Sequence, residues 1–201
     1  MRRRLLALGI GVLSALAVAG PALADTSPGP GNFRDSGSTR YLNSGASECA
    51  QNTCTDTYVY GQITDLQGGD TYMSVCFEQY TYPARQGGQF TQRFGCSEVD
   101  APTIADDLSS ASVDVTLLVT ECGRRTCSGE SSVTVTADFS AIGSPNAYSY
   151  TQKQQYETCT DTYRVRGQSV DAAGTIGVDG ASLDAFAQIG SETFAFSSRC
   201  R

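Results

Sequence analysis

The sequence contains no histidine, and Lys153 is its only lysine. Without histidine the chain cannot form the Ser-His-Asp or Cys-His arrangements that activate most nucleophilic serines and cysteines. The usual catalytic zinc sites also lose their most common ligand. One lysine makes a Ser-Lys dyad a poor alternative. The composition therefore predicts a protein that is not an enzyme and that uses no cofactor or metal.

Carboxylate chemistry is the catalytic option that remains. The chain has 21 Asp and Glu residues, and a pair of carboxylates can hydrolyse glycosidic bonds. Glu98, Asp100, Asp106 and Asp107 are clustered, but a charged loop between two modules explains them equally well. A polysaccharide hydrolase built on two carboxylates is therefore the less favoured alternative.

Residues 1–24 have the three parts of a secretory signal peptide. Three arginines follow Met1, an apolar run of 14 residues extends from Leu5 to Val18, and Ala22 and Ala24 fit the small-residue cleavage rule. The run is shorter than the roughly 20 residues that cross a bilayer. We expect cleavage after Ala24, secretion into the extracellular space, and no membrane span in the mature chain.

The mature chain is acidic. The leader carries three of the 14 basic residues and none of the 21 acids, so 177 residues remain with 11 basic side chains and a formal charge of −10. This charge repels phosphate backbones, and nucleic acid is not an expected partner. All eight cysteines lie in the mature chain, and an even number behind a signal peptide predicts disulfides.

Residues 25–45 are rich in Gly, Ser and Pro and have no hydrophobic periodicity. Such a segment buries too little apolar surface to offset its conformational entropy, so we predict a flexible tail. Phe33, Arg34 and Tyr41 are its candidate binding residues. The tail is either a docking peptide or a plain spacer.

From residue 46 the pattern is that of strands. Apolar residues alternate with other residues in 113–119, 133–139 and 183–189. Period two with Val and Thr enrichment is typical of half-buried strands. Turns containing Gly or Asn separate the runs, and no long stretch has helical spacing. The sequence predicts an all-β fold with antiparallel β-sandwich architecture.

A five-residue phrase, CTDTY, begins at Cys54 and again at Cys159. A cysteine follows each copy at a similar distance, because Cys96 is 42 residues after Cys54 and Cys200 is 41 after Cys159. The duplication predicts two related, disulfide-stapled β-modules, 46–110 and 111–201. The alternative is one sandwich whose two halves descend from one repeat.

The second module has a clear disulfide pattern. Cys122 and Cys127 bracket a four-residue turn between two strands, and a hairpin would bring them together. Cys159 and Cys200 would then connect the start of the module to its end.

The first module allows two disulfide patterns. Repeat equivalence favours Cys54–Cys96, which leaves Cys49–Cys76. However, the Glu-Cys-x-x-x-Thr-Cys spacing at Glu48 also occurs around Cys122. By that comparison Cys49 pairs locally with Cys54, and Cys76 pairs with Cys96 across a hairpin.

Tyrosine is the most frequent aromatic residue, with ten copies. Tyr72, Tyr80 and Tyr82 have the same parity, so one strand would place them on one face of a sheet. Such a stripe can bind a sugar or a protein because tyrosine combines contact area with a hydroxyl. The competing interpretation is cross-strand packing on a solvated face.

The segments Val75-Cys76-Phe77, Gly95-Cys96-Ser97 and Ser198-Arg199-Cys200, with the strands between them, resemble small secreted cysteine-rich β-proteins of high-GC Gram-positive bacteria. The resemblance covers residues 48–200. It implies an exported disulfide-rich β fold, and it implies no activity and no catalytic residues.

These observations predict an exported, non-catalytic binding or interaction protein whose partner is a protein or a polysaccharide. A docking subunit of a secreted multiprotein assembly is the alternative from another class.

Overall fold

A computed structural model describes residues 33–84, 90–123, 126–156 and 158–200. These residues form ten strands and no helix. The strands are β1 (Phe33–Ala50), β2 (Thr53–Leu66), β3 (Thr71–Pro83), β4 (Thr91–Ser97), β5 (Thr103–Ile104), β6 (Ser110–Cys122), β7 (Cys127–Ala141), β8 (Asn146–Tyr156), β9 (Cys159–Val178) and β10 (Ala181–Cys200). The predicted all-β, antiparallel fold is confirmed.

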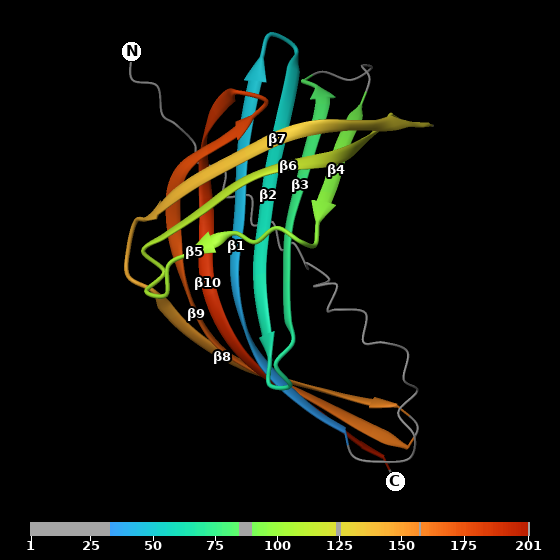
Figure 1. The fold of residues 1–201 in the computed structure, drawn as a ribbon, viewed down its shortest axis with the longest axis vertical. Coiled ribbons are helices and arrows are strands. Elements are labelled where there is room, and N and C mark those ends of the chain that lie inside the picture. Colours follow the sequence, from blue (N-terminus) through green and yellow to red (C-terminus); the bar gives the residue numbers. More distant parts are fainter. Residues whose placement is uncertain (1–32, 85–89, 124–125, 157, 201) are drawn as a thin grey trace.

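The strands belong to one sheet that closes on itself. The order of neighbours is β10-β1-β2-β3-β4-β6-β7-β9, and β9 pairs back with β10. β6 and β7 cross in front of β1, β2 and β10 (Figure 1). The described strands therefore form one continuous sheet and not the two separate sheets of the predicted sandwich.

The prediction of a flexible tail over residues 25–45 is wrong for residues 33–45. Residues 33–45 lie in β1, which pairs with β10 on one side and with β2 on the other. The composition of this segment did not indicate a strand, but the two neighbouring strands satisfy its backbone hydrogen bonds. The ring of Phe194 covers Gly37, where a Cβ would collide with it, and the ring of Tyr58 packs tightly over Gly45. Residues 25–32 lie outside the described part of the chain.

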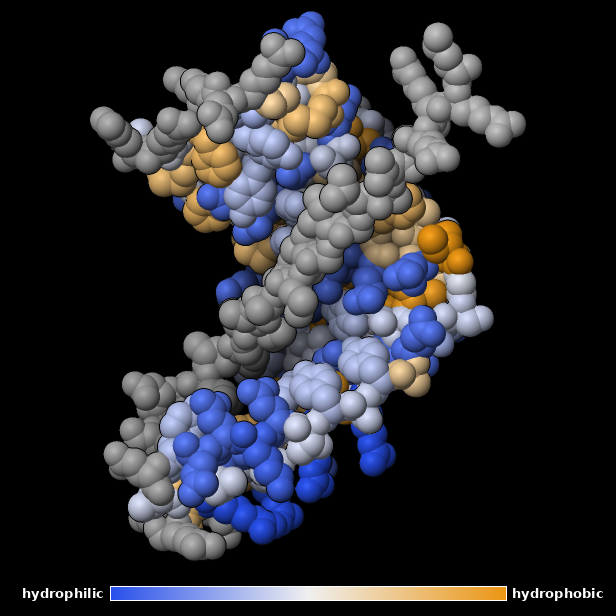
Figure 2. Space-filling view, turned by 180° about the vertical axis from the view of Figure 1, so that it is seen from behind, coloured by the Kyte–Doolittle hydropathy of each residue, from blue (hydrophilic) through white to orange (hydrophobic). Residues whose placement is uncertain are grey.

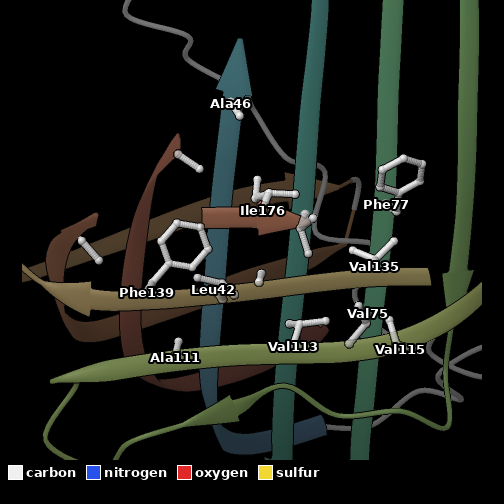
Figure 3. Packing of buried hydrophobic residues seen from close by; sticks show 14 of the residues in the cluster. Leu42, Ala46, Val75, Phe77, Ala111, Val113, Val115, Val135, Phe139 and Ile176 are labelled. Atoms are coloured by element: carbon white, nitrogen blue, oxygen red, sulfur yellow. The ribbon is translucent and has the colours of Figure 1, made fainter. Parts of the chain in front are cut away.

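One hydrophobic cluster fills the ring. Alternate residues of β6 and β7 face inward, and Phe139 and Val135 share the cluster with Leu42 of β1, Phe77 of β3 and Ile176 of the adjacent strand β9 (Figure 3). All five side chains are 1 % exposed or less. The cluster draws on both segments predicted as modules, so the two segments share one core.

All eight cysteines form disulfides. The pairs are Cys49–Cys54, Cys76–Cys96, Cys122–Cys127 and Cys159–Cys200. The pairing by repeat equivalence, Cys54–Cys96 with Cys49–Cys76, is wrong, and the local alternative is right.

The register explains the disulfide pattern. Each cysteine lies directly opposite its partner in a neighbouring strand, with Cα atoms 3.9 to 4.1 Å apart. Cys54 lies opposite Tyr82 of β3, and Cys96 pairs with β3 from its other side. The intervening strand therefore separates Cys54 from Cys96. The two CTDTY phrases each lie near the start of a strand, β2 or β9, but their disulfides are not equivalent.

Candidate functional site

β8, β9, β10 and the first half of β1 form a four-stranded sheet that extends from the ring. β7 pairs with β9 only at residues 172–178, and β8 takes its place along 159–169. We call residues 33–41, 146–156, 159–169 and 190–200 the sheet extension. It lies near the C-terminal end of the chain, at the lower right of Figure 1.

One face of the extension collects the basic residues. Lys153, Thr162, Ser197 and Arg34 lie in one row across the four strands. Because side chains alternate between faces along a strand, every second residue from this row faces the same side. We call this side the cationic face, and its basic residues are Arg34, Arg40, Lys153, Arg164, Arg166 and Arg199.

The positive charge on this face is largely uncompensated. The face holds six of the seven basic residues in the described part of the chain, Arg93 being the seventh. The acids of the extension, Asp35, Asp161 and Glu192, lie in rows of the opposite parity. Arg40 makes an ion pair with Asp106 of the loop after β5, at 2.9 Å. Among described residues the other five make no ion pair.

Two shallow hollows lie on the cationic face. Lys153, Arg164 and Arg166 line the first, and Arg34, Arg164 and Arg199 line the second. Arg164 borders both, so the hollows are contiguous. Figure 2 shows strongly hydrophilic side chains at this lower end of the molecule.

The chemistry of the face is that of anion binding. Guanidinium groups donate paired hydrogen bonds to carboxylate, sulfate or phosphate oxygens. Serine and threonine hydroxyls, including those of Ser149, Thr151 and Ser197, stand between the charges. Within the described residues, no group of three His, Cys, Asp or Glu side chains could hold a metal ion.

The opposite face of the extension is aromatic. The ring of Tyr41 covers Gly190, and the ring of Tyr148 covers Gly167, at positions where a Cβ would collide with each ring. The two hydroxyl oxygens lie 3.2 Å apart, and the Tyr148 hydroxyl donates to the Glu192 carboxylate. This network rigidifies the extension from the side away from the cations.

Burial governs the acidity of these tyrosines. Desolvation is the main reason that the pKa of Tyr41 and of Tyr148 is raised, and a hydrogen bond to Glu192 raises the pKa of Tyr148 further. Desolvation also raises the pKa of Tyr150 and Tyr163. All four are neutral at physiological pH, so they add no charge to oppose the cations.

The predicted tyrosine stripe is divided between two places. Tyr72, Tyr80 and Tyr82 alternate along β3 with the buried Val75 and Phe77, so they share the outer face. Tyr72 is eight residues from Tyr80, which is about 26 Å along a strand. The three side chains therefore do not form one continuous patch.

Tyr80 belongs to a cross-strand cluster. Its ring centroid lies 6.2 Å from that of Tyr58 and 6.0 Å from that of Phe90. Tyr58 stacks on Tyr60 at 6.3 Å. Burial, with a smaller effect of Glu78, raises the pKa of Tyr60 to about 12. This arrangement agrees with packing on an outer sheet face.

The candidate residues of the predicted tail fall on both faces of the extension. Arg34 lies on the cationic face, whereas Phe33 contacts Phe196 on the aromatic face with ring centroids 6.0 Å apart. Tyr41 also belongs to the aromatic face. Sequence reasoning missed Arg164 and Arg166, although their spacing of two in a strand was a detectable signal.

Comparisons with protein-family models, with curated proteins and with solved structures give no match. The described residues include no helix with the length and apolar character of a membrane span. The four disulfides are compatible with an extracellular setting.

Proposed function

We propose that this protein is an exported, non-catalytic binding protein and that its cationic face binds an anionic polysaccharide. One observation carries the proposal: six of the seven basic residues in the described part gather from four strands onto one face, whereas Asp35, Asp161 and Glu192 lie in rows of the opposite parity. An acidic chain with its cations segregated in this way attracts a negative ligand to one place.

The distribution of charge favours a polymer over a small anion. From Arg34 to Arg40 the face is six residues long, about 20 Å, and four strands span about 14 Å. The charges are spread over this area and do not converge on one point. A repeating anion engages several of them at once and gains affinity from the multiple contacts.

A sugar chain suits the face better than a nucleic acid does. Proteins that bind single strands place aromatic rings beside the charges so that bases can stack. Here Tyr148, Tyr163 and Phe194 lie on the opposite face, and each hollow is bordered by a single aromatic residue, Tyr150 or Phe196. The neutral residues between the cations are mainly serine and threonine, whose hydroxyls can bond to sugar hydroxyls and ring oxygens.

The predicted signal peptide and the four disulfides support export. The non-catalytic role is supported by the position of the carboxylates. Asp161 and Glu192 border neither hollow, and Asp35 alone of the three borders the second, so no pair of carboxylates lines either hollow beside the cations.

Binding of mature protein to alginate, a polyuronate, tests the proposal, with neutral dextran and duplex DNA as comparison ligands. We expect binding to alginate that weakens with added salt. The triple variant Lys153→Ser, Arg164→Ser, Arg166→Ser removes three exposed charges. At about 0.5 to 1 kcal/mol per surface contact, the dissociation constant rises about 10-fold to 150-fold.

The matched control changes the net charge by the same amount elsewhere. Ser131→Asp, Ser132→Asp and Ser140→Asp alter exposed positions of β7, and alginate binding should stay within about twofold. Equal losses in both variants would show that net charge alone acts. Tighter binding to DNA than to alginate would refute a polysaccharide ligand. Hydrolysis of the alginate would refute the non-catalytic role and favour the hydrolase alternative.

A further inference from the structure

No described strand pairs with the outer edge of β8. Each ring strand pairs on both sides, whereas β8 pairs only with β9 among the described residues. Its register with β9 runs without a shift from Asn146 to Tyr156. Ten of its 11 residues are exposed. Along the free side, every second residue points its N–H and C=O groups outward.

Natural edge strands usually carry features that prevent pairing with another chain, such as proline, bulges or several charges. β8 has no proline or glycine, and Lys153 is its only charged residue. The other side chains include Gln152 and Gln154, whose amides readily hydrogen-bond with a facing strand. This edge therefore has the properties of a pairing site.

We infer that two copies of this chain pair through β8, antiparallel and related by a two-fold axis at Thr151. This register aligns all 11 residues, so it is the longest one available. It places Lys153 opposite Ser149 of the other copy and Tyr150 opposite Gln152. A shift that centres the axis on Lys153 would set two ammonium groups face to face, which is unfavourable, and would shorten the pairing.

The symmetry joins the two cationic faces. An antiparallel edge-to-edge pair has its two-fold axis perpendicular to the sheet, so the same face of each copy points to the same side. The dimer then presents eight neighbouring strands and 12 basic residues as one surface, about 34 Å wide. A second copy therefore extends the cationic face of the first copy, whereas an unrelated peptide paired with β8 would add no basic residues of this face.

Polyanion binding and dimerisation are coupled in this arrangement. This part rests on the proposed function. Lys153, Arg164 and Arg166 of the two copies approach one another and repel, and a polyanion across the junction neutralises them. By linkage the polysaccharide strengthens the dimer by the same factor by which the dimer strengthens polysaccharide binding.

Sedimentation velocity of the mature protein tests the pairing, first in about 0.5 M salt without polysaccharide, where repulsion is screened, and then in low salt with a short alginate oligomer. We expect a concentration-dependent dimer in the first condition and a tighter dimer in the second. Ser149→Glu places a carboxylate opposite the partner copy's Lys153, whereas Ser149→Lys places an ammonium there.

Each of these substitutions acts at two symmetric pairs. The dimer dissociation constant should fall about 2-fold to 30-fold for the Glu variant at low salt and rise by a similar factor for the Lys variant. Thr160→Glu and Thr160→Lys make the same charge changes on β9, away from the β8 edge, and should move the constant less. A thermal unfolding midpoint confirms that each variant is folded.

A monomer at all concentrations in both conditions overturns the inference, and so does a dimer that responds equally at Ser149 and Thr160. A dimer without polysaccharide in a protein that fails to bind alginate would retain the pairing and refute the proposed ligand. If a dimer forms only with alginate and its dissociation constant does not change with the Ser149 substitutions, two copies bind one sugar chain without contact. This result would refute pairing through β8.

Discussion

The disulfides make unequal contributions to stability, and their sequence separations predict the order. Cys159–Cys200 spans 41 residues and Cys76–Cys96 spans 20. Cys49–Cys54 and Cys122–Cys127 each span 5. Closing a loop removes from the unfolded chain a constant amount of entropy plus an amount that grows with the logarithm of the loop length. At 25 °C the stabilisation is about 4, 3 and 2 kcal/mol for separations of this size.

The perturbation is a pair of serine substitutions at one disulfide at a time. The variant Cys159→Ser, Cys200→Ser should lose about 2 kcal/mol more unfolding free energy than Cys49→Ser, Cys54→Ser. For a domain of this size that difference lowers the melting temperature by about 4 to 8 °C.

Urea unfolding followed by circular dichroism measures these losses, and tyrosine fluorescence provides a second probe because the chain has no tryptophan. Equal losses in the two variants, or a larger loss at the short loop, would refute the loop-entropy reasoning. Non-reduced peptide mapping gives an independent check. A peptide that links Cys54 to Cys96 would contradict the register from which the separations were taken.

Three further predictions concern the core, a close backbone contact and alkaline pH. Phe139→Ala removes a fully buried ring and should cost about 3 to 5 kcal/mol in urea unfolding, whereas Phe186→Ala, 73 % exposed, should cost little. Gly174→Ala places a Cβ against the backbone of β7 and should destabilise by about 1 to 3 kcal/mol, while Gly129→Ala meets open space and should be neutral. The pKa of Tyr60 is raised from 10.0 to about 12, so the unfolded chain ionises first and stability falls as pH rises from about 10 to 12. Tyr60→Phe should flatten that decline in the thermal midpoint, and an unchanged slope would contradict it.

The strands β6 and β7 could be predicted from the sequence because their surroundings require alternation of apolar and polar residues. β6 and β7 each bury one face in the core and leave the other in solvent, so Val113 to Val119 and Val133 to Phe139 alternate cleanly. The strand β1 could not be predicted, because its surroundings impose little such alternation. In β1 only Leu42, Ser44 and Ala46 are buried, and half of its length forms the extension, where both faces are partly solvated.

The candidate site shows the same limit. Arg164 and Arg166 could be assigned to one side of a strand from their spacing alone. Their association with Arg34 and Lys153 depends on the register of β8, β9, β10 and β1, and residues more than 100 apart in sequence meet there. A shift of one residue in one strand would move its side chains to the other face and disperse the cations.

The sequence by itself determined the class of fold and the oxidation of its cysteines, because these follow from hydrophobic periodicity and from an even number of cysteines behind a predicted signal peptide. Tertiary structure decided the disulfide partners, the closure of the sheet and the collection of charge on one face. These three depend on which strands become neighbours and in which register. Local composition carries no record of that choice, since β1 lies between β2, which follows it directly, and β10 from the far end of the chain.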